Sequence, residues 1–337
     1  MLHLSCIYFY WARSKDLKMS KDLSGQDLSE KDLSNQNFQS FNFEHANLKK
    51  ANLENSKLWY ANLNFANLQE ANLRGAGLGC GKFYRSNMKD TNLQNTNLRE
   101  VKLHSVFLPE TDLSGKDLFG ISLDFSVLDG SNFSFAHLGN FDVNQRVIYG
   151  MQASLFGASL CKSNFTEANL FYADLTKADL TEANLQKVYG QDIQLIEANL
   201  KKANLTEATL HFANLTKADL TKADLTKADL TKADLTKADL TEANLTQTNL
   251  EAANLTKADL TKADLTEANL EQANLTKADL TEANLTKANL KKANLRDTDL
   301  SYAKYEKAKF RNAEYNQYTK FPKRFNPEKK GMILKED

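Results

Sequence analysis

The residue types that most often carry chemistry occur in this chain, but they are not grouped. The five histidines lie far apart in the sequence, at His3, His45, His104, His137 and His211. No serine or cysteine nucleophile with a matching base, no glycine-rich phosphate loop and no metal-spaced set of ligands stands out. The sequence therefore predicts a protein that is not an enzyme, with no catalytic residue, no metal and no cofactor.

The aspartates and cysteines lead to the same expectation. Aspartates such as Asp219 and Asp224 recur five residues apart, so their spacing belongs to a repeat and indicates a structural role. The three cysteines are Cys6, Cys80 and Cys161, which is too few and too dispersed for a disulfide framework or a zinc site. Any catalytic or metal site would have to lie where the repeat is irregular.

The repeat itself has five residues, as in Ala218-Asp219-Leu220-Thr221-Lys222. We call its leucine or phenylalanine the central position and number the neighbours from it: alanine is at −2, Asp or Asn at −1, often Thr or Ser at +1, and mostly Lys, Glu or Gln at +2. One series holds phase from Leu23 to Val143 and a second from Leu155 to Tyr315. The repeat therefore sets the fold of most of the chain.

A period of five fits neither regular secondary structure. On an α-helix it would spread the leucines around every side, and on a flat strand it would place them on alternate faces. A chain that turns a corner once per repeat points positions −2 and 0 inward and the others outward. Asn, Asp and Thr favour such corners through side chain to backbone hydrogen bonds. The period thus predicts a solenoid with coils paired along its long axis.

At this point the chain resembles the pentapeptide repeat family, whose A-(D/N)-L-x-x pattern it shows in units such as Ala243-Asn244-Leu245-Thr246-Gln247. The resemblance implies an all-β fold, a right-handed quadrilateral β-helix with four repeats in each coil. About fourteen coils at the strand spacing of roughly 4.8 Å would give a rod on the order of 70 Å long. The family pattern carries no catalytic residues.

Breaks in the pattern suggest five parts. We expect an N-terminal cap over 1–20, repeat segments over 21–143 and 155–317, a bend or loop over 144–154 where the phase slips by two residues, and a C-terminal cap or tail over 318–337. Translation from Met19 is the alternative explanation of the N-terminus. The C-terminal segment resembles the closing segment of cyanobacterial-type members. Its aromatic residues could seal the last coil within one chain or form a homodimer.

Two groups of outward aromatic residues are candidate partner-binding sites. A coil of twenty residues stacks the repeats centred on Leu170, Gly190 and Leu210, and glycine at a central position leaves a gap. Around that gap lie Phe171, Tyr172, Tyr189, Asp192, His211 and Phe212. These rings could bind a partner or fold over the gap to fill it. A second, weaker group consists of Trp59, Tyr60, Phe65, Tyr84 and Arg85, for which a chance surface cluster is the alternative.

Charge and hydropathy restrict the partner and the compartment. The 43 basic and 43 acidic residues cancel, which gives no reason to expect direct nucleic-acid binding. No segment is apolar over the roughly 20 residues that a membrane span needs, and a cytoplasmic location is the default. The resemblance allows mimicry of DNA in binding DNA gyrase, but residues 151–300 carry 17 basic and 22 acidic groups, which is not a sustained acidic surface. We predict a rigid protein-binding scaffold, with a secreted effector as a further alternative.

Overall fold

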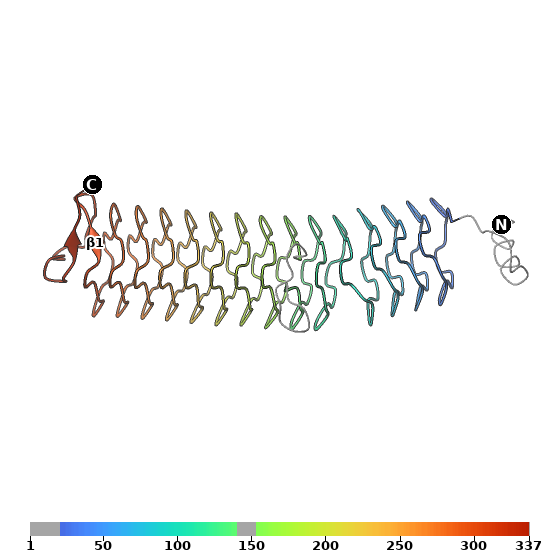
Figure 1. Ribbon diagram of the computed structural model, residues 1–337, viewed down its shortest axis with the longest axis horizontal. Coiled ribbons are helices and arrows are strands. Elements are labelled where there is room, and N and C mark those ends of the chain that lie inside the picture. Colours follow the sequence, from blue (N-terminus) through green and yellow to red (C-terminus); the bar gives the residue numbers. More distant parts are fainter. Residues whose placement is uncertain (1–20, 140–152, 337) are drawn as a thin grey trace, which may run out of the picture.

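The protein is an elongated solenoid of stacked coils (Figure 1). The computed structural model describes residues 21–139 and 153–336. Its two strands are β1 (Glu314–Tyr315) and β2 (Ile333–Leu334), which pair in parallel at the C-terminal end. Elsewhere in the described residues the coils are joined by single-residue parallel bridges.

These bridges form a ladder with a step of twenty residues. Asp219 pairs with Asp239, and Asp239 pairs in turn with Asp259. Leu220 N–H donates to the carbonyl oxygen of Asp239 at 2.7 Å, and Asp239 N–H donates to the carbonyl oxygen of Ala218 at 2.9 Å. Since a repeat has five residues, each coil contains four repeats, and the chain has the β-helix type of fold that the family resemblance implies.

Each corner is a tight turn held at both ends. In the unit above, Ala223 N–H donates to the carbonyl oxygen of Leu220 at 2.9 Å. In the described repeats up to Asn312 the residue at +2 is left-handed, with φ between 53° and 62° where it is not glycine. This conformation costs an L-residue roughly 1–2 kcal/mol. The side chain at −1 offsets part of this cost, because Asp219 Oδ1 accepts hydrogen bonds from both the N–H and the hydroxyl of Thr221.

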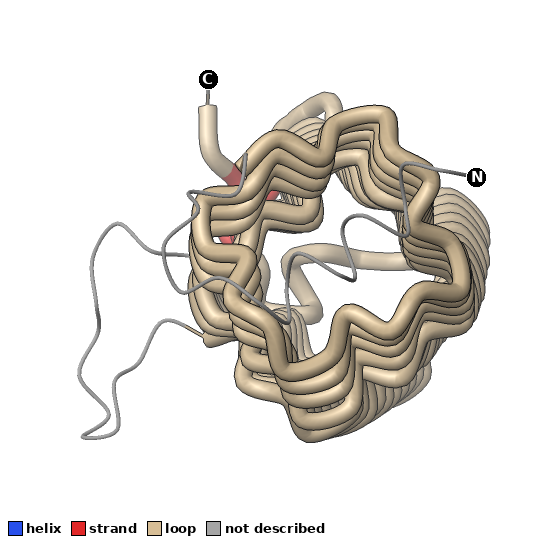
Figure 2. Tube along the Cα trace, turned by 90° about the vertical axis from the view of Figure 1, so that its right-hand side faces the viewer, coloured by secondary structure: helices blue, strands red, loops and turns tan. Residues whose placement is uncertain are grey.

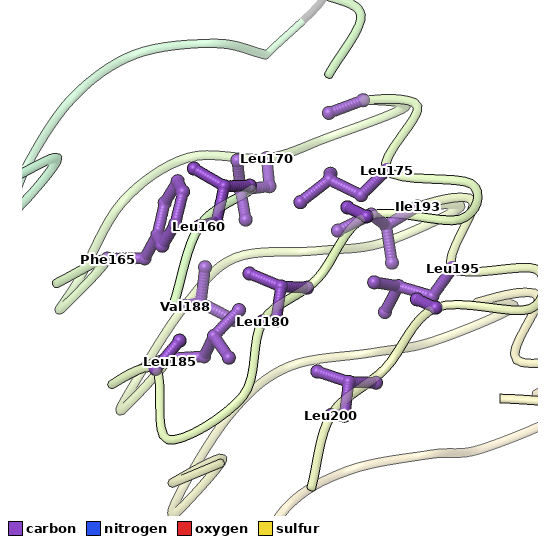
Figure 3. Packing of buried hydrophobic residues seen from close by; sticks show 14 of the residues in the cluster. Leu160, Phe165, Leu170, Leu175, Leu180, Leu185, Val188, Ile193, Leu195 and Leu200 are labelled. Atoms are coloured by element: carbon purple, nitrogen blue, oxygen red, sulfur yellow. The ribbon is translucent and has the colours of Figure 1, made fainter. Parts of the chain in front are cut away.

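The core is a stack of leucines flanked by alanines. Leu160, Leu180 and Leu200 lie in successive coils (Figure 3), and each is completely buried. Alanine at −2 is also buried, as Ala178 and Ala198 show. Seen end-on, the coils lie over one another along the rod (Figure 2). The small side chain at −2 lets the coil close tightly around the larger one.

The ladder continues from the first repeat series into the second, with a step of 32 residues instead of 20. Ser122 pairs with Ser154, and Leu123 N–H donates to the carbonyl oxygen of Ser154 at 2.7 Å. Leu155 thus stacks on Leu123. The five-residue series of the sequence had placed Val143 there, and Val143 lies outside the described residues. The expected boundary at 154 needs correction, since Ala153 is buried in the core and Ser154 already pairs.

The gap at Gly190 is filled from inside the core. A Cβ atom at this position would lie 2.9 Å from Cδ2 of Leu210 and 3.4 Å from Cγ2 of Ile193. Ile193 and Val188 occupy −2 positions and are larger than the usual alanine, and both are fully buried. The atoms nearest to such a Cβ thus belong to core side chains and not to the outward aromatic rings.

The two ends of the rod differ. The expected cap over 1–20, including Met19, lies outside the described residues. In the first coil the −2 residues Lys21, Gln26 and Lys31 are exposed, and Gln36 is half-buried. At the other end the rings of Phe321 and Phe325 stack at 4.8 Å, and Phe325 packs edge-on against Phe310 at 5.1 Å.

The C-terminal segment therefore seals the last coil within one chain. β2 extends the ladder beyond β1, and Ile333 N–H donates to the carbonyl oxygen of Ala313 at 2.8 Å. The homodimer that was the alternative stays a prediction. No helix in the described ranges is long and apolar enough to cross a membrane.

Candidate functional site

Two histidines of the described coils contact a side chain of the neighbouring coil. His45 stacks on Phe65 at 4.8 Å between ring centroids, and His104 contacts the Ser122 hydroxyl at 3.1 Å. His3 lies outside the described residues. Within 21–139 and 153–336, no group of three or more His, Cys, Asp or Glu side chains could hold a metal ion.

Cys161 is not set up as a nucleophile. Burial, and after it the hydrogen bond that its thiol donates to Asp179 at 3.3 Å, raise its pKa to about 11. The thiol therefore stays protonated at neutral pH, and the reactive form of a cysteine is the thiolate.

All six residues in the stronger predicted group lie in consecutive coils on one side of the rod. The bridges run from Asn169 through Tyr189 and Thr209 to Asp229. Tyr189 is 57% exposed and Phe212 is 48% exposed. Lys232 lies over the ring of Phe212 at 5.4 Å. We call the surface formed by Tyr189, Asp192, His211 and Phe212 the aromatic patch.

The polar members of the aromatic patch have partners within it or beside it. Asp192 Oδ2 accepts a hydrogen bond from Gln191 at 3.1 Å. His211 Nε2 lies 2.6 Å from Oδ2 of Asp229, but without the alignment of a good hydrogen bond. Burial works against the ionised form of Asp229, but the hydrogen bonds from Thr231 and the closeness of the His211 ring outweigh it, and the pKa of Asp229 is lowered.

Phe171 and Tyr172 differ from the other aromatic residues of the predicted group. They are half-buried, and their rings meet edge-on with centroids 4.5 Å apart. The structure thus brings them beside the aromatic patch as a packed pair.

The weaker predicted group divides between two sides of the coil. Trp59 is 50% exposed and Tyr60 is 59% exposed, and both follow the central residue Leu58. Gly77 leaves room for the indole, since a Cβ atom there would clash with Nε1 of Trp59.

The remaining three residues of that group lie on the next side of the coil. Phe65 and Tyr84 meet edge-on at 5.5 Å. The Arg85 guanidinium lies over the Tyr84 ring at 5.3 Å. These contacts explain the cluster as packing between neighbouring coils.

The sequence did not reveal that Trp59 and the aromatic patch share one side of the rod. Bridges connect Lys57 through Gly77 to Asn97, and His137 connects to Asn169 across the 32-residue step. The central residues Leu58, Leu138, Leu170 and Leu210 are therefore in one register. A reading of the interruption as twelve extra residues, rather than as a two-residue slip, would have placed them together.

Comparison with known proteins identifies the repeat along most of the chain. A family model described as pentapeptide repeats matches eight times, at residues 22–55, 46–78, 82–115, 151–186, 193–232, 233–272, 263–301 and 278–314. No curated protein matches the chain.

Several solved structures resemble the chain. HetL, a pentapeptide repeat protein involved in heterocyst differentiation regulation in the cyanobacterium Nostoc sp. strain PCC 7120, is 29% identical, with a TM-score of 0.45 over 63% of this chain and 86% of its own. Rfr23 from the cyanobacterium Cyanothece 51142 is 39% identical, with a TM-score of 0.28 over 28% of this chain and 63% of its own. QnrB1, a plasmid-mediated fluoroquinolone resistance protein, is 16% identical, with a TM-score of 0.23 over 71% of this chain and 84% of its own.

Proposed function

Because the chain belongs to the pentapeptide repeat family, we propose that it is a right-handed quadrilateral β-helix that acts as a non-catalytic, rigid scaffold for binding another protein. The observation that carries this proposal is the aromatic patch. In the regular coils, positions −1, +1 and +2 hold residues such as Asp219, Thr221 and Lys222. Exposed tyrosine and phenylalanine depart from that pattern without being needed by the core.

The patch has the character of a protein contact surface. Tyr189 and Phe212 each expose about half of a large ring, and rings of this kind often carry much of the binding energy when a partner buries them. Lys232 and Asp192 place charges at its edge, which favours a partner with an apolar centre and a polar rim. The ladder fixes the backbone beneath the rings, so little conformational entropy is lost on binding.

A variant that restores the repeat pattern tests this function. Tyr189→Asn, His211→Thr and Phe212→Gln use residues that occur at −1, +1 and +2 of the same row, at Asn249, Thr231 and Gln272. We expect this triple variant to keep its circular dichroism spectrum and to lose a specific set of co-purifying proteins.

The matched control removes rings elsewhere. Phe125 and Phe135 are 60% and 61% exposed at +2 positions outside the patch. Phe125→Lys with Phe135→Lys should leave the same set of proteins bound. If the triple variant and the wild type retain the same partners, the aromatic patch is not the binding surface. If neither binds any protein specifically, the scaffold function itself fails.

A further inference from the structure

The hydrogen-bonded ladder is interrupted between two neighbouring coils, 81–100 and 101–120. From Asp22 to Asp299, all but two of the −1 residues of the described repeats pair with their counterparts in the next coil. The two missing pairs are Asn92 with Asp112 and Asn97 with Asp117. The coils are thus separated along two adjacent sides.

Main-chain groups on both walls of this opening have lost their partners. The regular pattern would have Leu93 N–H donate to the carbonyl oxygen of Asp112, and Asp112 N–H donate to that of Thr91; neither bond forms. The next side likewise lacks the bond from Leu98 N–H to the carbonyl oxygen of Asp117. Within the described residues, none of these N–H groups donates elsewhere.

The opening is bounded at both ends. On one side Met88 N–H donates to the carbonyl oxygen of Phe107 at 2.9 Å. On the other, Glu100 N–H donates to the carbonyl oxygen of Phe119 at 2.9 Å. There the Arg99 guanidinium lies over the Phe119 ring at 4.7 Å and forms an ion pair with Asp117. The separation is therefore a local cleft between two joined coils.

The −2 residues of these coils give a physical reason for the opening. Here the usual buried alanine is replaced by larger or polar residues, namely Thr91, Thr96, Val101, Val106, Thr111 and Lys116. The three threonines are 6–9% exposed, whereas Ala198 and Ala218 are 1% exposed. Lys116 Nζ reaches across the cleft and donates to the carbonyl oxygen of Leu93 at 3.0 Å.

An inward lysine also requires access to polar surroundings. Burial lowers the pKa of Lys116, with the charge of Asp112 opposing that effect. A charged ammonium in a closed leucine core would be far more costly. Opening the coils at this point lets the ammonium reach a carbonyl oxygen and solvent.

The cleft has the size and lining of a binding site. Its volume is about 530 Å³, within the range of roughly 300–1,000 Å³ that is usual for ligand pockets. Its charged lining consists of three carboxylates, Asp90, Glu110 and Asp112, and one ammonium, Lys116. The rest of the lining is mostly polar and includes Asn92, Gln94, Asn95 and Ser114, with Leu93 and Pro109 as its apolar residues.

We propose that this cleft binds a short, basic, extended peptide segment of another protein through main-chain hydrogen bonds. On one wall, a carbonyl oxygen of the inserted strand would accept a hydrogen bond from Leu93 N–H, and an N–H of the strand would donate to the Thr91 carbonyl oxygen. On the other wall, the strand would pair with the main chain of Asp112. The peptide would thus act as an additional piece of coil. Such strand addition to unpaired sheet edges is a common mode of peptide recognition. The excess of carboxylates selects basic side chains.

The inserted segment has about the length of one repeat, because the cleft lies chiefly along one side of the coil. The site is separate from the aromatic patch, so it can exist whether or not that surface binds a protein.

The test is a selection from a library of displayed random heptapeptides. Wild-type protein is the target, and the library is depleted on a closed variant in which Thr91, Thr96, Thr111 and Lys116 are all changed to the alanine of the repeat. We expect enrichment of peptides rich in Lys or Arg. In synthetic form they should bind the wild type and slow hydrogen exchange of the amides of Leu93 and Asp112. Affinity for the closed variant should be at least about tenfold lower.

Two controls keep the result interpretable. N-methylation of alternate peptide bonds should abolish binding, because it removes the main-chain donors. Asp90→Asn with Glu110→Gln, which leaves every −2 residue in place, should weaken binding of the basic peptides several-fold even if the closed variant does not fold. The proposal is overturned if no peptide is enriched, if N-methylated peptides bind equally well, or if the Leu93 and Asp112 amides of the free protein exchange as slowly as those of regular coils.

Discussion

At the scale of single residues, the hydrogen bonds of the side chain at −1 explain why Asp and Asn recur in most repeats. Its oxygen accepts the N–H of the +1 residue, as Asp239 does from Thr241 at 2.9 Å. Where −1 is Asn, its side-chain amide can also donate a hydrogen bond to the −1 side chain of the preceding coil, as Asn249 does to Asp229. These polar residues thus hold the corners and need no catalytic role.

This role predicts a dependence of stability on pH. The pKa values of Asp179, Asp219 and Asp229 are lowered from 3.8; burial raises each of them, but hydrogen bonds from the threonine two residues later and from other neighbours outweigh it. A carboxyl group with a lowered pKa in the folded state stabilises the protein above its unfolded-state pKa, and the contribution is lost as pH falls through the folded-state value. Thermal unfolding followed by circular dichroism should therefore show Tm falling below about pH 4. A Tm unchanged between neutral pH and about pH 2 would contradict this role.

At the scale of the coil, the volume of −2 and central side chains must balance. Gly190 lacks a side chain, and its neighbours Val188 and Ile193 exceed alanine in size. Leu210 and Ile193 occupy the space in which a side chain at 190 would begin. The total volume of the buried side chains is thus kept, although the individual residues depart from the repeat pattern.

The balance can be tested by restoring one residue at a time. Gly190→Leu alone should destabilise the protein by about 1–3 kcal/mol, because it overfills the core. Adding Val188→Ala and Ile193→Ala removes the excess and should recover most of that loss. Denaturant midpoints of the single and triple variants measure both effects. Equal midpoints for the two variants would show that the side chains do not share this space.

The step of 32 residues leads us to predict that the twelve extra residues can be removed without loss of the fold. Removal of residues 141–152 would leave Leu138-Gly139-Asn140 followed directly by Ala153-Ser154-Leu155, which restores the five-residue phase. Asn140 would then occupy a +2 position, where asparagine tolerates positive φ. We expect the shortened protein to keep its spectrum and, within a few degrees, its Tm. Aggregation or loss of β structure on removal would show that these twelve residues are required for folding.

At the scale of the whole molecule, the five-residue period predicts which side chains point inward, because only a corner in every repeat keeps leucine and alanine together in the core. The twenty-residue coil came from the family resemblance, and the ladder agrees with it. The register across the interruption could not be predicted, because a slip of two residues and an insertion of twelve residues both bring the five-residue pattern back in the observed phase. The cleft was missed because Thr91 and Thr111 look like tolerable substitutions singly, whereas the opening depends on their joint volume together with the charge of Lys116.

The charge pattern gives the last prediction, which concerns the alternative function in DNA mimicry. Basic and acidic residues compensate one another between coils, as in Lys217 with Glu197 at 2.8 Å and Lys287 with Glu267 at 2.7 Å. Exposed pairs of this kind contribute only about 0–1 kcal/mol each, but they remove the continuous negative field that a mimic of duplex DNA needs. We therefore expect no inhibition of DNA gyrase and no protection from a quinolone in a supercoiling assay. Inhibition that persists at high salt would contradict this expectation, because contacts other than long-range electrostatics would then be sufficient for binding.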